Sequence, residues 1–157
     1  WQEYGEPLSI ALTDTYGTDF FFRDFTREQA LAWRGLRHDS GDPIAFGENA
    51  IAFYKAHGID PMAKVLVFSD GLDCETIFKI HNYFKGRIQA IFGWGTNLTN
   101  DCGVKPLSLV VKVSNVNGHG TVKLSDNLAK AMGSPEDIER FKKVFGHSAT
   151  LDEPCRY

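Results

Sequence analysis

Short apolar runs alternate with segments of helical periodicity over the first hundred residues of the chain. The runs cover 8–13, 35–38, 64–68 and 87–92, and such uninterrupted runs are typical of strands buried on both faces. Apolar residues at helical spacing occupy 15–25, 43–57 and 74–85 between them. This β-α-β-α-β-α-β order predicts an α/β fold in which helices connect parallel strands.

Capping residues mark the ends of two of these helices. Asp42 precedes Pro43, a pair that suits an N-cap and the first helical position, and Gly58 follows as a stop. Asp73 and Gly86 bracket the next helix in the same way. The side chains expected to face the core are Ile44, Ala50, Ile51, Tyr54, Ala56, Ile77, Ile80, Tyr83 and Phe84.

The pattern changes after Pro106. Apolar segments at 107–113 and 121–124 flank Asn117-Gly118, which is a strong signal for a hairpin turn. Ser134 and Pro135 then open a helix that runs to Phe145. We therefore expect a β-hairpin and a short helix, followed by a tail over 147–157.

Length and composition narrow the class of protein. The chain has 157 residues, 43% of them hydrophobic and 24% charged, as in one globular domain. It contains no apolar run of 18 residues, so we expect no membrane-spanning segment and no membrane partner. A net charge of −3 argues against a nucleic-acid partner.

The cysteines and the first residues suggest where the protein works. Cys74, Cys102 and Cys155 are odd in number and widely separated, which favours reduced thiols in the cytoplasm over a disulfide framework. The first residues lack the basic and apolar pattern of a signal peptide. Because the chain begins with Trp1, we read it as a piece of a longer protein.

Polar residues follow each predicted strand at similar intervals. Asp14, Asp39, Asp70 and Gly95 are separated by 25, 31 and 25 residues, close to the length of about 30 residues for one βαβ unit. The carboxyl ends of parallel strands meet at one rim, where α/β proteins bind ligands. An aspartate after a strand is often only a helix cap, but this recurrence favours a shared site.

Two of these strand ends suit phosphate. Arg37 could simply pair with Asp39, but its fork of donors is also suited to a phosphate group. The Gly93-Trp94-Gly95-Thr96 loop could be a plain turn, but its glycines allow backbone amides to approach an anion. No G-K-[ST] follows, so it is not a P-loop.

Two carboxylates lie beside the predicted phosphate site, although they carry the same sign of charge as a phosphate. Asp39 and Asp70 would repel a phosphate unless they meet ribose hydroxyls or a Mg²⁺ ion, which takes carboxylate and phosphate oxygens together. The histidines show no metal-ligand spacing, and only His38 lies among the candidate residues. These features favour a phosphorylated sugar or nucleotide as ligand without naming the reaction.

Five collinear motifs resemble nicotinate phosphoribosyltransferase, and specifically the carboxy-terminal portion of its chain. The similarity extends from about residue 8 to the last helix, and five motifs in order are far more specific than any one alone. The motifs are Ala11–Thr18, Leu36–Pro43, Phe68–Asp73, Phe92–Asp101 and Val122–Asn127.

The resemblance implies a fold and a reaction. It implies part of an irregular (β/α) barrel of the type II phosphoribosyltransferase kind over 1–105, with a β-hairpin, C-terminal helix and tail of the same domain over 106–157. The family makes nicotinate mononucleotide and pyrophosphate from nicotinate and phosphoribosyl pyrophosphate in NAD salvage, with coupled ATP hydrolysis, and so combines ligase and pentosyltransferase chemistry. It further implies Mg²⁺, small-molecule substrates and a homodimer, or assembly with the missing half of the chain.

The resemblance also assigns roles to individual residues. Arg37 would hold substrate phosphate, Asp39 would contact ribose hydroxyls directly or through Mg²⁺, and Asp14 would partner the family's phosphorylated histidine. These three are the implied catalytic residues. The implied substrate- and phosphate-binding residues are Arg37, Asp39, Ser40, Gly41, Asp70, Gly71, Gly93, Gly95 and Thr96.

The chain departs from the family at two points. In the family the phosphorylated histidine lies upstream of the Asp14 strand, in a stretch that this chain does not contain, and His38 is not at the matching position. Trp94 stands where relatives often have a smaller residue. Two other interpretations therefore stay open beside the enzyme. One is a non-catalytic module that binds a sugar phosphate or nucleotide. The other is a structural half-barrel that needs a partner to fold.

Overall fold

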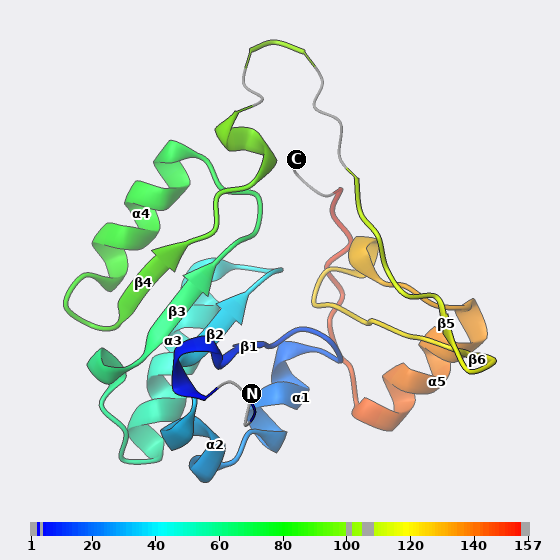
Figure 1. Cartoon of the computed structure of the whole chain (residues 1–157), viewed down its shortest axis with the longest axis horizontal. Coiled ribbons are helices and arrows are strands. Elements are labelled where there is room, and N and C mark those ends of the chain that lie inside the picture. The colour runs from blue at the N-terminus through cyan, green and yellow to red at the C-terminus, as the bar shows by residue number, and fades with distance from the viewer. Residues whose placement is uncertain (1–2, 4, 100–101, 105–108, 155–157) are drawn as a thin grey trace.

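A parallel sheet of four strands organises the chain (Figure 1). The computed structural model describes residues 3, 5–99, 102–104 and 109–154. The strands lie side by side in chain order, with all three pairings parallel. They are β1 (Ile10–Leu12), β2 (Gly35–His38), β3 (Val65–Phe68) and β4 (Gln89–Phe92). The predicted α/β fold with parallel strands is confirmed, with strand ends within one or two residues of those expected.

Four helices connect the strands: α1 (Thr18–Asp24), α2 (Arg27–Ala32), α3 (Pro43–Ala56) and α4 (Cys74–Phe84). Their apolar sides form a single core with one face of the sheet. Leu66 and Phe68 of β3 lie in this core with Tyr54 of α3 and Phe84 of α4, and all four are at most 1% exposed. Burial of these side chains is the main force that holds the helices against the sheet.

The opposite face of the sheet is more open. Leu12, Arg37, Val67 and Ile91 stand in register as one row across the four strands. Leu12 is 37% exposed and Ile91 is 52% exposed. Arg37 is therefore a charged residue on a largely apolar face, at the end of β2 from which the next loop departs.

The predicted caps of α3 and α4 are confirmed. The carboxylates of Asp42 and Asp73 each accept a hydrogen bond of 2.7 Å from the amide three residues on. Two predicted core positions are wrong: Ala56 is exposed at the last position of α3, and Tyr83 is 44% exposed. Tyr83 lies under the guanidinium of Arg87, which is 5.2 Å from its ring centre.

The predicted helix over 15–25 is shorter than expected, and a separate helix follows it. Thr26 starts α2 through a capping box in which its hydroxyl accepts from the Gln29 amide and its own amide donates to the Gln29 side chain. This local cap competes with continuation of α1, and Phe25 adopts an extended conformation between the two helices. Four short 3₁₀ turns complete the connections: η1 (Glu6–Leu8), η2 (Pro61–Ala63), η3 (Thr96–Leu98) and η4 (Leu128–Lys130).

The predicted hairpin forms, but its strands are only two residues long. β5 (Asn115–Val116) and β6 (His119–Gly120) pair antiparallel around Asn117-Gly118, both of which have positive φ. The longer strands expected over 107–113 and 121–124 are wrong for the described residues. The segment 109–113 makes no ladder, and 121–124 contributes one isolated bridge, from Lys123 to Met132. Residues 107 and 108 lie outside the described part.

Helix α5 (Pro135–Phe145) forms as predicted, and its last residue, Phe145, meets Phe20 of α1 with ring centres 4.9 Å apart. Ser134 caps it, and Gly146 ends it in the left-handed conformation. The rings of Tyr16 and Phe145 stack at 4.1 Å. Among the described residues, no helix has the length and apolar character needed to cross a bilayer. Cys74 and Cys102 are exposed free thiols, and Cys155 lies outside the description.

Candidate functional site

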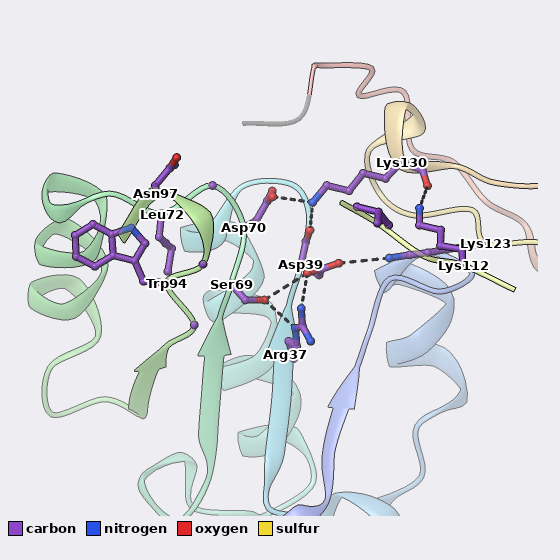
Figure 2. A pocket seen from close by; sticks show the side chains of 14 residues that line it. Arg37, Asp39, Ser69, Asp70, Leu72, Trp94, Asn97, Lys112, Lys123 and Lys130 are labelled. Carbon is purple, nitrogen blue, oxygen red and sulfur yellow. Dashed lines mark hydrogen bonds and ion pairs between the residues drawn. The ribbon is translucent and has the colours of Figure 1, made fainter. Parts of the chain in front are cut away.

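A cavity of about 370 Å³ opens at the carboxyl ends of β2, β3 and β4 (Figure 2). The loops after these strands form one side of it, and the segments around 110–112, 123 and 130 form the other. The residues that line it are Arg37, Asp39, Ser69, Asp70, Gly71, Leu72, Gly93, Trp94, Gly95, Asn97, Val110, Lys112, Lys123 and Lys130.

Arg37 is held in place at the base of the cavity. Its Nε donates to Ser69 Oγ at 2.8 Å, and its Nη2 donates to Asp39 Oδ1 at 2.9 Å. Ser69 Oγ in turn donates to the carbonyl of His38 at 2.9 Å. The guanidinium is thus oriented by two partners while its side chain stays 47% exposed, so it can still contact a ligand.

Lys130 connects the loops after β2 and β3. Its Nζ donates to Asp70 Oδ1 at 2.7 Å and also to the backbone carbonyl of Asp39. The residue is the last of the η4 turn, whose N-cap Asn127 accepts from the amide of Ala129. A short turn from late in the chain therefore places an ammonium group between two strand ends.

Lys123 and Lys112 complete the basic side of the cavity. Lys123 Nζ lies 3.4 Å from Asp39 Oδ2 and 3.2 Å from Asp14 Oδ1. Lys112 Nζ donates to the carbonyl of Lys130 at 3.2 Å. With Arg37, four cationic side chains and two carboxylates line the described cavity. This excess of positive charge suits a ligand with two or more negative charges.

A buried polar cluster lies behind Lys123. Asp14 is 1% exposed, and its Oδ2 accepts hydrogen bonds of 2.8 Å from both Ser40 and Ser125. Burial acts to raise the pKa of Asp14, but the Lys123 ammonium and the two hydroxyls together lower the pKa below its ordinary value. Asp14 is therefore an ionised carboxylate at neutral pH.

Asp126 is a second acid close to this cluster. Its Oδ1 accepts a hydrogen bond of 2.8 Å from the amide of Thr18, at the start of α1. Because Gly17 provides no side-chain cap, Asp126 satisfies this helix end from a distant part of the chain. Burial is the main cause that raises the pKa of Asp126, and the charge of Asp14 adds to it.

Six of the residues predicted to bind substrate line the cavity: Arg37, Asp39, Asp70, Gly71, Gly93 and Gly95. Ser40 and Gly41 are outside this lining, and Ser40 is buried against Asp14. Asp14 is linked to the cavity through Lys123. Thr96 opens η3, but its side chain lies outside the described part.

The side chains of His38 and Trp94 both pack within the fold. His38 is 2% exposed, and its Nε2 lies 3.1 Å from the carbonyl of Gly41. Burial lowers the pKa of His38, which keeps the ring neutral. Trp94 packs against the core and also lines one end of the cavity, with its ring away from Arg37 (Figure 2). The size of Trp94 thus contributes to packing beside the glycine loop.

Sequence reasoning missed the three lysines. The Val122–Asn127 motif pointed to the region of Lys123, but no residue in it was assigned a role. Lys112 and Lys130 are isolated basic residues in the sequence. Only the folding of the late segment over the strand ends brings them to the cavity.

Comparison with known proteins identifies close relatives. A family model described as the nicotinate phosphoribosyltransferase (NAPRTase) family matches residues 1–149. The crystal structure of nicotinate phosphoribosyltransferase from Vibrio cholerae is similar, with a TM-score of 0.85, 40% identity, and coverage of 90% of this chain and 36% of that chain. The enzyme from Porphyromonas gingivalis gives a TM-score of 0.81, 43% identity, and coverage of 88% and 38%. The chain thus spans little more than a third of the length of these relatives.

Proposed function

Because the chain belongs to the nicotinate phosphoribosyltransferase family, we propose that it supplies the phosphoribosyl- and pyrophosphate-binding part of such an enzyme. The reaction joins nicotinate to phosphoribosyl pyrophosphate and yields nicotinate mononucleotide and pyrophosphate, a step of NAD salvage. The observation that carries this proposal is the cavity at the strand ends, where four cations surround two carboxylates.

The residues suggest how the site would promote the reaction. Departure of pyrophosphate from the sugar leaves positive charge on the ring and adds negative charge to the leaving group. Arg37, Lys123 and Lys130 line one cavity and are held by ion pairs before any ligand arrives. Such fixed cations stabilise the leaving group without reorganisation at the moment of reaction.

The carboxylates serve the sugar in this proposal. Asp39 and Asp70 line the same cavity, from the loops after adjacent strands. Their oxygens are suited to accept hydrogen bonds from the ribose 2- and 3-hydroxyls. Gly93 and Gly95 line the same cavity from the loop after β4, where small residues let a phosphate approach the main chain.

Magnesium fits this set of donors. The described residues include no group of three or more acidic, histidine or cysteine side chains suited to holding a metal. Mg²⁺ often uses only one or two carboxylates and takes its remaining ligands from substrate phosphates and water. Asp39, with Asp70, would hold the ion, which would supply further positive charge beside the leaving group. ATP as a co-substrate rests on the family resemblance.

Three further features belong to the proposal. The open sheet face, with Leu12 and Ile91 exposed, supports continuation of the sheet into a (β/α) barrel of the type II kind. The homodimer with a site at its interface rests on the family resemblance alone. A cytoplasmic location is supported by the free thiols of Cys74 and Cys102.

Titration calorimetry with phosphoribosyl pyrophosphate tests the site. The variant Arg37→Gln should bind at least about tenfold more weakly, since it loses a charged bidentate partner of phosphate. Arg34→Gln is the matched control, because Arg34 also pairs with an acid, Glu6, but precedes β2 at the opposite end of the strand. Equal affinities for the two variants, or no binding by the unmodified chain, would contradict the proposal.

A binding module without turnover is the second candidate. It is favoured by the cavity itself, because the four cationic side chains that line it suffice to bind an anion without turnover. Incubation of the chain with nicotinate, phosphoribosyl pyrophosphate, ATP and Mg²⁺ separates the two. Formation of nicotinate mononucleotide supports the catalytic role, while ligand binding without product supports the module.

A further inference from the structure

A single ammonium group connects the buried cluster to the cavity. Lys123 Nζ lies between Asp14 Oδ1 at 3.2 Å and Asp39 Oδ2 at 3.4 Å. We propose that Lys123 is a positioning residue, anchored by Asp14 from behind, and that this anchor holds its ammonium in place for an anionic ligand. The inference rests on the proposed function for the identity of that ligand.

Asp14 has the geometry of an anchor. Its Oδ2 is saturated by the hydroxyls of Ser40 and Ser125, whereas its Oδ1 is buried and accepts no hydrogen bond from the described residues. Lys123 is the one cation recorded within 4 Å of it in the described part of the chain. A buried carboxylate requires a counter-charge, so Asp14 restrains Lys123 whether or not a ligand is present.

Asp39 is held from two directions. Arg37 contacts its Oδ1, and Lys123 faces its Oδ2. An anion in the cavity would compete with Asp39 for Lys123, but it cannot reach Asp14, which is 1% exposed. Lys123 therefore stays in place when a ligand displaces Asp39, and the cost of ordering its long side chain is met before binding.

This anchoring predicts an effect opposite to that of simple electrostatics. Removal of a negative charge close to an anion site should strengthen anion binding. Asp14→Asn removes such a charge but also releases Lys123, and we expect inorganic pyrophosphate to bind about tenfold more weakly. Asp126→Asn is the matched control: it removes a nearby acid that has no recorded contact with Lys123 and keeps an oxygen for the Thr18 amide. It should bind pyrophosphate as tightly as the unmodified chain, or more tightly.

A double-mutant cycle completes the binding test. Calorimetry at constant ionic strength would compare Asp14→Asn in the unmodified chain and in the Lys123→Gln background. In the second background Asp14→Asn should no longer weaken binding, whereas it should keep its effect in a Lys112→Gln background. Lys123→Arg should restore part of the lost affinity. The proposal is overturned if Asp14→Asn binds as tightly as Asp126→Asn, or if its effect persists without Lys123.

Urea unfolding of the same variants separates this inference from the proposed function. If the unmodified chain binds no pyrophosphate, the proposed function fails. The coupling between Asp14 and Lys123 is then measured from the unfolding constants of the single and double variants. Lys123→Gln alone should raise the unfolding constant about a hundredfold, and the added Asp14→Asn should recover much of that loss. The coupling is also supported if Asp14→Asn or Lys123→Gln alone fails to fold and the double variant folds. Additive effects on unfolding overturn it.

Discussion

Gly47 provides a sharp test of packing between α3 and α4. A Cβ at this position would lie 2.1 Å from Cζ of Phe84, with the two Cε atoms at 2.6 and 2.8 Å. Phe84 is fully buried and stacks on Phe68 with ring centres 5.6 Å apart. The ring cannot turn away into solvent, so Gly47→Ala must push α3 and α4 apart or displace Phe84 from its stack.

Two opposing terms set the size of the effect. Alanine is favoured over glycine in a helix interior by about 1 kcal/mol. Overpacking of a well-packed core costs about 1–3 kcal/mol, and a contact near 2 Å with a rigid ring falls at the upper end of that range. The net loss should be about 1–2 kcal/mol. For a chain of this length it would lower Tm by about 3–6 °C.

Urea denaturation followed by far-UV circular dichroism measures this loss. The midpoint should fall at an unchanged m-value, because the folded state stays compact. Asn49→Ala is the control: it is exposed on the same helix and gains helix propensity without a contact, so its stability should be unchanged or slightly higher. In combination with Phe84→Leu, Gly47→Ala should cost less than it does alone. A Gly47→Ala chain as stable as the unmodified protein would refute the reasoning.

Three further predictions concern charged groups. Asp39→Asn should weaken the binding of ribose 5-phosphate, because a hydroxyl of the ligand loses a carboxylate acceptor. The same variant should strengthen the binding of pyrophosphate without Mg²⁺, because Asp39 no longer competes for Arg37 and Lys123. Calorimetry with both ligands tests this. Burial raises the pKa of Asp126, so its ionised form destabilises the folded state at pH 7. Asp126→Asn should therefore be more stable than the unmodified chain at pH 7. Urea unfolding at a series of pH values should show this gain in stability shrinking as the pH falls towards 4, where Asp126 becomes protonated. Lys64→Met should lower the free energy of unfolding by about 2 kcal/mol in the same assay, because the buried Lys64 Nζ donates to the carbonyls of Leu31 and Trp33. Lys55 is exposed on α3, so Lys55→Met should change the free energy of unfolding little.

The sheet and its helices could be predicted because their signals are local. Asp42 and Asp73 cap helices through atoms three residues away, and the Val65–Phe68 run is buried as its composition indicates. The α2 helix was missed although its capping box is also local. The aromatic residues before Phe25 have the spacing of one continuous helix, and this periodicity gives no sign that a second helix begins at Thr26.

The cavity was only half predictable, because its two sides come from different parts of the chain. Asp39 and Asp70 follow β2 and β3, where the repeat of the strand-end position reveals them, and Arg37 lies just before the end of β2. Lys130 meets Asp70 across 60 residues of sequence. No periodicity encodes a contact of this kind. The wrong prediction for Ser40 has the same cause. Its sequence position after β2 suggests a residue that lines the cavity, but its hydroxyl is buried in hydrogen bonds with Asp14 and Ser125.

The cap that Asp126 provides for α1 has a consequence for the order of folding. Each strand of the sheet meets its neighbour after one short crossover, so β1 to β4 can associate as they emerge during synthesis. The start of α1 depends on a hydrogen bond between residues 108 positions apart. Closing so long a loop is entropically costly and slow. The first helix of the chain should therefore be among the last to gain full protection from hydrogen exchange, with its amino-terminal turn docking only after the loop at Asp126 arrives.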